Sequence, residues 1–230
     1  PPQVHCIARP PQNLPDEVSM HLPSSLKKEL QTDFDAHGDA IRLRLAEFRA
    51  VPEKRWFYEL CYCLMTPQSS ARQCALVCEE LERGGFQQTG FDPTSLLRSH
   101  QGGYVRFHNT KARRLRAARE QWPDTLGHIR GDLADRPLRN KLAETVAGLG
   151  YKEASHFLRN IGRSNLAIVD RHIIRNLVRL GVLAEWPTSI SRRRYMEIEA
   201  LFEDLARTVA IPMDELDLLL WRRETGFLLK

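Results

Sequence analysis

Two residues in the second half of the chain, Lys152 and Asp170, could carry out nucleophilic chemistry together. Lys152 follows Gly150 by two positions, in the predicted first turn of a helix, whose positive end disfavours an ammonium group and favours the free amine. A neutral lysine amine is the nucleophile of Schiff-base chemistry. A carboxylate such as Asp170 can cap a helix, stabilise a cationic intermediate or assist proton transfer. Each residue alone also has an ordinary interpretation, as a surface lysine and as a structural cap.

The elements that must position these residues are two predicted helices separated by Gly148-Leu149-Gly150. The first runs from Asp135 to Ala147 and the second from Tyr151 to Ile161. Two glycines around one apolar residue allow a tight turn, and they expose backbone N–H groups that can hold a phosphate at a helix start. Gly148 and Gly150 are therefore candidate phosphate contacts. A plain turn between two helices is the alternative.

The other periodic segments also predict helices, and no alternating strand or hairpin signal is present. Helices are expected over residues 40–50, from a cap at Ser69 or Ser70 to Gly84, from an Asp170 cap to Gly181, from a Ser191 cap through Leu205, and over residues 214–224. We therefore predict an all-α fold. The proline-rich segment that ends at Pro23 is expected to drape over its surface.

The composition excludes several classes of protein. The chain has 230 residues, of which 42% are hydrophobic and 27% charged, as in soluble proteins that bury a core. Its longest apolar run, Leu60 to Met65, is far shorter than the roughly 20 residues of a membrane span. The first residues have neither the basic start nor the apolar middle of a secretion signal. We expect no membrane association and a cytoplasmic location.

The cysteines do not predict a metal centre. The spacing C-x-C followed by C-x₃-C is not a usual zinc pattern, and cysteines in an apolar run act as small hydrophobic residues. We expect reduced thiols, and no metal, at all five positions: Cys6, Cys61, Cys63, Cys74 and Cys78.

Basic residues gather in one stretch of a chain whose net charge is +5. Such a stretch would attract a phosphate backbone, although a solvated helix face is the alternative. It contains no acidic residue and six basic ones: Arg106, Lys111, Arg113, Arg114, Arg116 and Arg119.

The combination of a helix, Gly148-Leu149-Gly150, Lys152, a second helix and then Asp170 resembles the helix-hairpin-helix (HhH-GPD) superfamily of DNA glycosylases. Several separated motifs are similar to one branch, the archaeal-type second family of 8-oxoguanine DNA glycosylase/AP lyases. These motifs lie within residues 56–230 and are ELCYCLMTPQSSA, VRFHNTKA, GYKEASHFLRNIG, AIVDRHIIRNL and DLLLWRRETGFLLK.

The resemblance implies a bifunctional enzyme that excises 8-oxoguanine and then cuts the strand. Lys152 would attack the anomeric carbon, expel the base and form a Schiff base, and β-elimination would nick the DNA. Asp170 would activate Lys152 and stabilise the sugar cation. The resemblance also implies two helical subdomains with a cleft between them: residues 56–165 with the hairpin and Lys152, and residues 1–55 plus 166–230 with Asp170 and the base pocket.

A base inside a duplex must be flipped out before an enzyme can reach it. The resemblance implies that Gln68 fills the resulting gap, that Phe107 is the apolar wedge and that Arg106 addresses the opposite base. Without the family, Phe107 could equally pack in the core and Gln68 could be a capping or surface residue. Phosphate contacts are expected from Lys111, Arg113, Arg114 and Arg116.

The base pocket is expected at the last helix. Asp217 and Trp221 are four residues apart and therefore share a helix face. The resemblance implies that an aromatic ring on this helix stacks on the oxidised base and that the carboxylate of Lys230 reaches that base. The alternative places Trp221 in the core and leaves the terminus frayed.

The expected partner is duplex DNA that contains 8-oxoguanine, bound by a monomer without a redox cofactor. No iron–sulfur cluster is expected, because the members that carry one have four cysteines near the C-terminus and this chain has none after Cys78. A Na⁺ or K⁺ ion could sit at the hairpin carbonyls. Two alternatives stay open: a glycosylase/lyase for oxidised pyrimidines that resembles endonuclease III, and a non-catalytic helix-hairpin-helix module that only binds DNA.

Overall fold

The computed structural model describes residues 22–228. This part of the chain forms twelve helices and no strand; its one isolated bridge joins His100 and Gly103. The helices are α1 (Ser24–Arg49), α2 (Glu53–Met65), α3 (Ala71–Arg83), α4 (Phe86–Thr89), α5 (Thr94–Arg98), α6 (His108–Glu120), α7 (Trp122–Arg130), α8 (Asp135–Thr145), α9 (Tyr151–Asn160), α10 (Arg171–Arg179), α11 (Arg192–Val209) and α12 (Met213–Thr225). The predicted all-α fold is confirmed.

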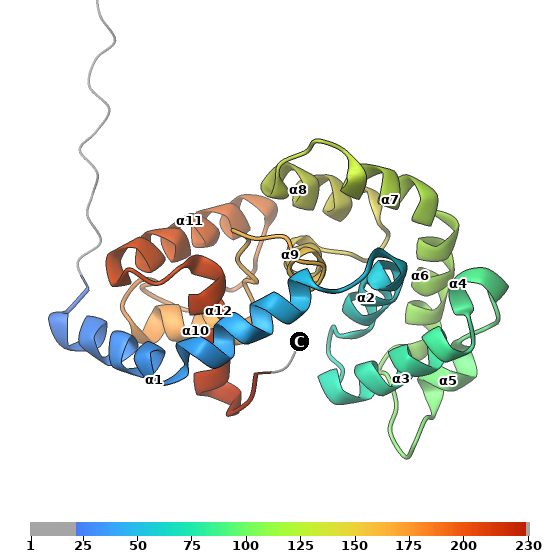
Figure 1. The fold of residues 1–230 in the computed structure, drawn as a ribbon, viewed down its shortest axis with the longest axis horizontal. Coiled ribbons are helices and arrows are strands. Elements are labelled where there is room, and N and C mark those ends of the chain that lie inside the picture. The colour runs from blue at the N-terminus through green and yellow to red at the C-terminus, as the bar shows by residue number, and fades with distance from the viewer. Residues whose placement is uncertain (1–21, 229–230) are drawn as a thin grey trace, which may run out of the picture.

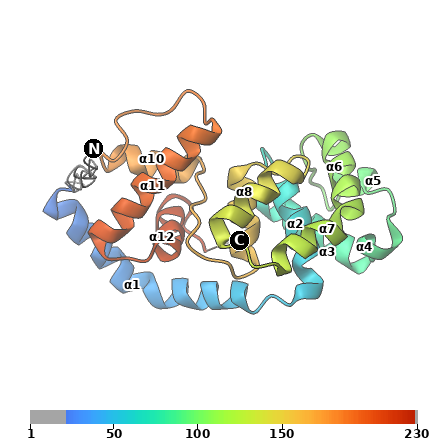
Figure 2. The same ribbon diagram turned by 90° about the horizontal axis from the view of Figure 1, so that it is seen from above.

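The helices form two groups with α9 between them (Figures 1 and 2). One group contains α1 and α10 to α12, and the other contains α2 to α8. Each group has its own hydrophobic core: one core runs from Phe57 to Leu166, and the other joins residues 22–48 to residues 167–220. The change of core after Leu166 supports two subdomains that meet near the proposed boundary.

Helix α1 is much longer than the segment predicted from periodicity. It begins at Ser24 directly after Pro23, whereas the apolar pattern predicted a start at Ala40. Its polar first half is helical because it packs along α12 and α11, where Leu30 and Gly38 are buried. Tertiary contacts therefore override the weak local signal. The proline-rich residues 1–21 lie outside the described residues.

The predicted helix caps are mostly confirmed. Ser70, rather than Ser69, caps α3 by accepting a hydrogen bond from the Gln73 N–H, and Ser191 caps α11 in the same way. Helix α8 stops at Thr145, two residues before the predicted end, because Val146 is already extended as the chain enters the hairpin.

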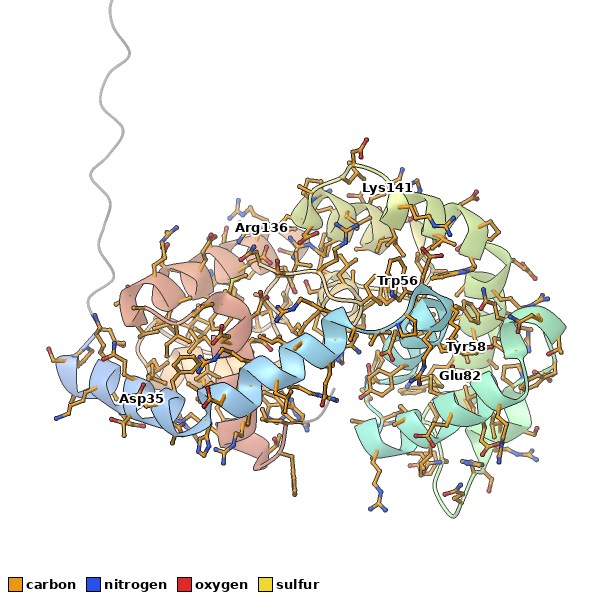
Figure 3. The ribbon with its side chains drawn as sticks, in the orientation of Figure 1. Asp35, Trp56, Tyr58, Glu82, Arg136 and Lys141 are labelled. Carbon is orange, nitrogen blue, oxygen red and sulfur yellow. The ribbon has the colours of Figure 1, made fainter. Side chains whose placement is uncertain are left out.

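A buried ion pair ties the hairpin helices to the other group. Arg139 on α8 is fully buried and donates to both carboxylate oxygens of Glu199 on α11, at 3.0 and 2.9 Å. The same guanidinium donates to the hydroxyl of Ser155 on α9 at 3.3 Å. Arg136 makes a second bridge from α8 to α11, with a 2.8 Å hydrogen bond to Glu203 (Figure 3). These contacts hold α8, α9 and α11 together.

Helices α2 and α3 contribute many residues to the core of the α2–α8 group. Tyr58 on α2 is buried in this core, and Glu82 on α3 lies near it (Figure 3). The Tyr58 carbonyl accepts a hydrogen bond from the Cys78 thiol at 3.0 Å, and its hydroxyl accepts one from the Gln87 N–H. Burial raises the pKa of the Cys61 and Cys63 thiols well above the usual range, as expected for unreactive core cysteines.

Candidate active site

A cleft of about 980 Å³ lies where the two groups of helices meet. Its walls come from the end of α2, the turn that follows it, α9, the start of α10 and α12. Six of the residues singled out in the sequence line this cleft, although they are spread over more than 150 positions of the chain: Gln68, Arg106, Lys152, Asp170, Asp217 and Trp221.

Lys152 lies in the first turn of α9, directly after the hairpin. The following residues of α9, from Ala154 to Asn160, are all buried, so the helix that carries Lys152 is firmly seated. The lysine side chain keeps 27% of its surface exposed toward the cleft, and its Nζ lies 3.5 Å from an oxygen of Glu153. Lys152 is therefore an accessible amine on a rigid element.

Asp170 caps α10, as predicted. Its Oδ1 accepts hydrogen bonds from the N–H groups of His172 and Ile173 at 2.8 and 2.9 Å. These bonds orient the carboxylate, and Asp170 lines the cleft together with residues of α9. The cap role is thus confirmed, and it leaves the carboxylate in the cleft that also holds Lys152.

Side chains from α11 and α12 hold the irregular segment that leads into α10. The Ala167 N–H donates to Glu199 at 3.1 Å, and the Ala167 carbonyl accepts from the Tyr195 hydroxyl at 2.6 Å. The Ile168 N–H donates to Asp217 at 3.2 Å. Buried backbone groups need such partners, and here no neighbouring strand supplies them. Three side chains therefore determine where the capping carboxylate of α10 lies.

Asp217 is buried at the back of the cleft and is paired inside the protein. Its Oδ1 accepts from Arg159 at 3.2 Å, and its Oδ2 accepts from the Ile168 N–H. Burial raises the pKa of Asp217 to about 7, although Arg159 opposes this rise. Because both oxygens already have partners, the structure gives Asp217 a supporting role in addition to the base contact predicted from sequence.

Trp221 lies in the cleft and is half-buried, so the alternative that placed it in the core is wrong. Its ring contacts the edge of His172, with centroids 6.4 Å apart. An indole in this position offers an apolar surface to a planar ligand. Lys230, the other residue predicted for the pocket, lies outside the described residues.

Gln68 and Phe107 both have backbone conformations that side chains rarely adopt. Their φ angles are +55° and +60°, in the left-handed region that costs a residue with a side chain about 1–2 kcal/mol. Such strain is common at functional sites. Phe107 is 51% exposed, so the core-packing alternative is wrong, and the Arg106 guanidinium lies 4.9 Å from its ring centre.

The hairpin has the tight turn predicted from its glycines. Gly148 has a φ of +87°, and the Leu149 N–H donates to the Val146 carbonyl at 3.1 Å. Arg114 packs directly on this turn, because a Cβ atom at Gly148 would lie only 2.3 Å from its Cδ. The structure thus brings together two of the predicted phosphate contacts, the hairpin amides and Arg114.

The rest of the basic stretch is not a uniform phosphate surface. Arg113 is exposed, whereas Arg116 pairs with Asp92 at 2.6 Å. Lys111 is only 1% exposed, and its Nζ hydrogen-bonds the carbonyls of Met65 and Pro67. The predicted phosphate contact of Lys111 is therefore wrong, because a DNA backbone cannot reach a buried ammonium.

Sequence reasoning did not identify several further polar residues of the cleft, among them Glu153, His156, Arg159 and His172. A signal existed for His156, which follows Lys152 by four residues and so shares its helix face. Its ring packs edge-on against Tyr62, with centroids 5.8 Å apart. No comparable signal pointed to Arg159, because its partner Asp217 is 58 residues away.

Metal and membrane signals are both missing from residues 22–228. No group of three or more His, Cys, Asp or Glu side chains in this range could hold a metal ion. None of its helices is both long enough and apolar enough to cross a membrane.

Comparison of the sequence with known proteins points to one family. The 8-oxoguanine DNA glycosylase family model matches residues 41–211. An 8-oxoguanine DNA glycosylase/AP lyase of Korarchaeum cryptofilum is 39% identical over 208 residues, which cover 85% of this chain and 98% of the relative. A protein of the same name from Fusobacterium nucleatum is 35% identical over 212 residues, 88% of this chain and 96% of the relative.

The fold of this chain also matches a solved structure of the same family. The crystal structure of the Methanocaldococcus jannaschii 8-oxoguanine glycosylase/lyase, in complex with a 15mer DNA containing 8-oxoguanine, superposes with a TM-score of 0.79. The two chains are 32% identical, and the match covers 90% of this chain and all of the other. With this agreement of sequence, fold and cleft, the chain belongs to the 8-oxoguanine DNA glycosylase family of helix-hairpin-helix proteins.

Proposed function

We propose that the protein is a bifunctional 8-oxoguanine DNA glycosylase/AP lyase that uses Lys152 as its nucleophile and Asp170 as its catalytic carboxylate. The observation that carries this proposal is the single cleft lined by both residues, with Lys152 at the start of α9 and Asp170 at the start of α10. Relatives that match nearly their full length bear the same activity in their names.

The chemistry proceeds in balanced steps. The Lys152 ammonium first gives a proton to Asp170, and the resulting amine attacks C1′ of the flipped nucleotide while the C1′–N9 bond breaks with its electron pair leaving on the base. The base takes up the proton held by Asp170 and departs, which restores the Asp170 carboxylate. Opening of the sugar ring then gives a Schiff base between C1′ and Nζ. Loss of a C2′ proton expels the 3′-phosphate by β-elimination, and water releases the enzyme.

Asp170 suits both of its roles. A carboxylate beside the sugar stabilises the positive charge that develops as the base leaves. It can also accept a proton from the lysine ammonium, which must be neutral to attack. Since its Oδ1 is occupied by the two backbone N–H groups of α10, we assign Oδ2 to these tasks.

The base pocket and the DNA contacts follow from the same cleft. Trp221 would stack on the flipped 8-oxoguanine, with Asp217 behind it and Lys230 completing the pocket. Phe107 would enter the base stack, Gln68 would fill the gap, and Arg106 would address the opposite base. Gly148, Gly150, Arg113, Arg114 and Arg116 would contact phosphates. Duplex DNA is thus the proposed partner, bound by a monomer that acts on chromosomal DNA in the cytoplasm.

No redox cofactor or iron–sulfur cluster is part of this proposal, because the chemistry is carried by an amine and a carboxylate. A Na⁺ or K⁺ ion at the hairpin would use backbone carbonyls near Gly148, and Arg114 already places a positive charge against that turn. This neighbour makes the hairpin a poor match for a bound cation, and we do not assign one to the mechanism.

The test is borohydride trapping on a duplex with 8-oxoguanine opposite cytosine. The wild-type protein should form a covalent adduct, and Lys152→Gln should bind the duplex without forming one. Asp170→Asn should fold and lose excision by about 10²- to 10⁴-fold, the usual contribution of a positioned acid or base. An adduct with Lys152→Gln would remove Lys152 as the nucleophile.

The same assay separates the two alternative functions. Excision of oxidised pyrimidines without excision of 8-oxoguanine would favour the activity of the endonuclease III type. Binding without any strand scission, unchanged by Lys152→Gln, would favour a non-catalytic DNA-binding module.

A further inference from the structure

A single buried ammonium connects α6 to the end of α2 and the turn after it, although these segments are more than 40 residues apart in sequence. Lys111 Nζ donates to the carbonyls of Met65 and Pro67, at 2.5 and 2.7 Å, and to the hydroxyl of Ser69 at 2.9 Å. A lysine ammonium has three N–H donors, and here all three bind the end of α2 or the turn after it. Lys111 itself belongs to α6, the helix that follows the loop with Arg106 and Phe107, called here the wedge loop.

The hydroxyl of Ser69 makes a second connection, which joins the turn after α2 to the wedge loop. Besides its bond with Lys111, it accepts a hydrogen bond from the Arg106 N–H at 2.9 Å. Gln68 therefore lies between two residues that are bound to α6 or to the wedge loop. Phe107 in turn lies between Arg106 and the first turn of α6, where its carbonyl accepts from the Lys111 N–H at 2.9 Å.

These contacts bracket the two strained residues of the site. Gln68 is the third residue of a four-residue turn, which is closed by a hydrogen bond from the Ser69 N–H to the Thr66 carbonyl at 3.0 Å. A positive φ persists at a residue with a side chain only where its surroundings hold it. Both side chains remain exposed although their backbones are held, as required of groups that must enter a base stack.

We propose that Lys111 and Ser69 are positioning residues, which hold Gln68 and Phe107 at a set separation so that both enter the DNA gap together. This inference rests on the proposed glycosylase function. In this inference Lys111 positions the two loops from its buried site, whereas its burial excludes a phosphate contact. Burial also lowers the pKa of Lys111 to about 8, with Arg114 acting in the same direction.

The test measures wedge insertion separately from chemistry. The probe is a duplex with a tetrahydrofuran abasic analogue, which cannot react, beside a 2-aminopurine whose fluorescence rises when the stack opens. Lys111→Met removes the three donors with little change of side-chain volume, and Ser69→Ala removes one acceptor. Ser191→Ala is the control, because it removes a serine cap of α11 that has no contact with either loop.

We expect wild type and Ser191→Ala to raise the fluorescence equally at saturating protein. Lys111→Met should abolish most of this rise and lower single-turnover excision of 8-oxoguanine by about 100-fold, the effect of misplacing a reacting group by about 1 Å. Ser69→Ala should have a smaller effect in the same direction. The double variant should be somewhat worse than Lys111→Met, because Ser69→Ala also removes the separate hydrogen bond from the Arg106 N–H.

Each outcome decides the inference. A full fluorescence rise with a folded Lys111→Met protein would overturn it and leave Lys111 a structural residue. If Lys111→Met does not fold, Ser69→Ala decides, and a rise equal to that of Ser191→Ala would overturn the inference. A wild-type protein that opens the stack but does not excise 8-oxoguanine would instead contradict the proposed function.

Discussion

The buried carboxylate of Asp217 shows how a single residue couples the base pocket to the stability of the fold. One of its oxygens accepts a hydrogen bond from Arg159, and the other accepts one from the Ile168 N–H. Ile168 belongs to the segment that ends in Asp170. Loss of either contact would leave a buried charge or a buried N–H without its partner. The free-energy cost of such an unpaired group exceeds the stabilisation that the contact itself provides.

Asp217→Asn should make stability less dependent on pH. The usual pKa of this carboxyl is 3.8, and burial raises it to about 7 in the folded protein. Between these values the folded state retains a proton that the unfolded state has released, so the free energy of unfolding falls as pH rises from about 4 to about 7. Urea unfolding of both proteins across this range measures the slope. Equal slopes for wild type and Asp217→Asn would contradict the expectation.

At the scale of elements, the hairpin between α8 and α9 combines a strained turn with a packed side chain. Gly148 needs its positive φ for the turn, and it needs the absence of a Cβ for the approach of Arg114. The two requirements have different origins, one in the backbone and one in tertiary packing. The two effects can therefore be separated by comparing Gly148 with a glycine that has a positive φ but no close side chain.

Gly148→Ala should lower both stability and DNA affinity. The positive φ alone costs about 1–2 kcal/mol, and displacement of Arg114 adds to this cost and disturbs a predicted phosphate contact. The matched control is Gly181→Ala, which has a φ of +72° and no neighbour within 4 Å of the added Cβ. Thermal unfolding and binding to an abasic-analogue duplex check both effects. Equal stability losses, with unchanged affinity, would show that Arg114 simply moves aside.

For the whole molecule, the two helix groups are joined by buried polar contacts as well as by the chain. Arg139, Glu199 and Ser155 link α8, α9 and α11, and Glu199 also holds the backbone before α10. The helix with Lys152 and the segment with Asp170 are thus connected through one buried network. This explains how residues from different groups keep a constant relation across the cleft.

The salt dependence of DNA binding should distinguish exposed from buried basic residues. Each phosphate contact contributes about 0.9 to the slope of log K against log salt concentration. Arg113→Ala should therefore lower the slope by about 1, since Arg113 is exposed on α6. Lys111→Met should leave the slope unchanged, since Lys111 is buried. Fluorescence anisotropy over a salt series provides the measurement, and a lower slope with Lys111→Met would reinstate its phosphate contact.

The sequence by itself predicted the all-α fold, most helix caps, the hairpin turn, and the places of Lys152 and Asp170 at the starts of their helices. These features depend on local rules: glycine allows positive φ, an aspartate caps the next helix, and apolar spacing marks a buried face. Family motifs added Phe107 and Gln68 as the proposed wedge and gap residues, which also lie in short contiguous stretches.

Only the tertiary structure decided which partner each polar side chain has. The sequence placed Lys111 among the phosphate contacts, because charge density along a helix does not reveal which side faces the protein. Its acceptors Met65, Pro67 and Ser69 are more than 40 residues away. The pairing of Arg159 with Asp217 and the long first half of α1 were hidden for the same reason: each depends on contacts between segments that are distant in the chain.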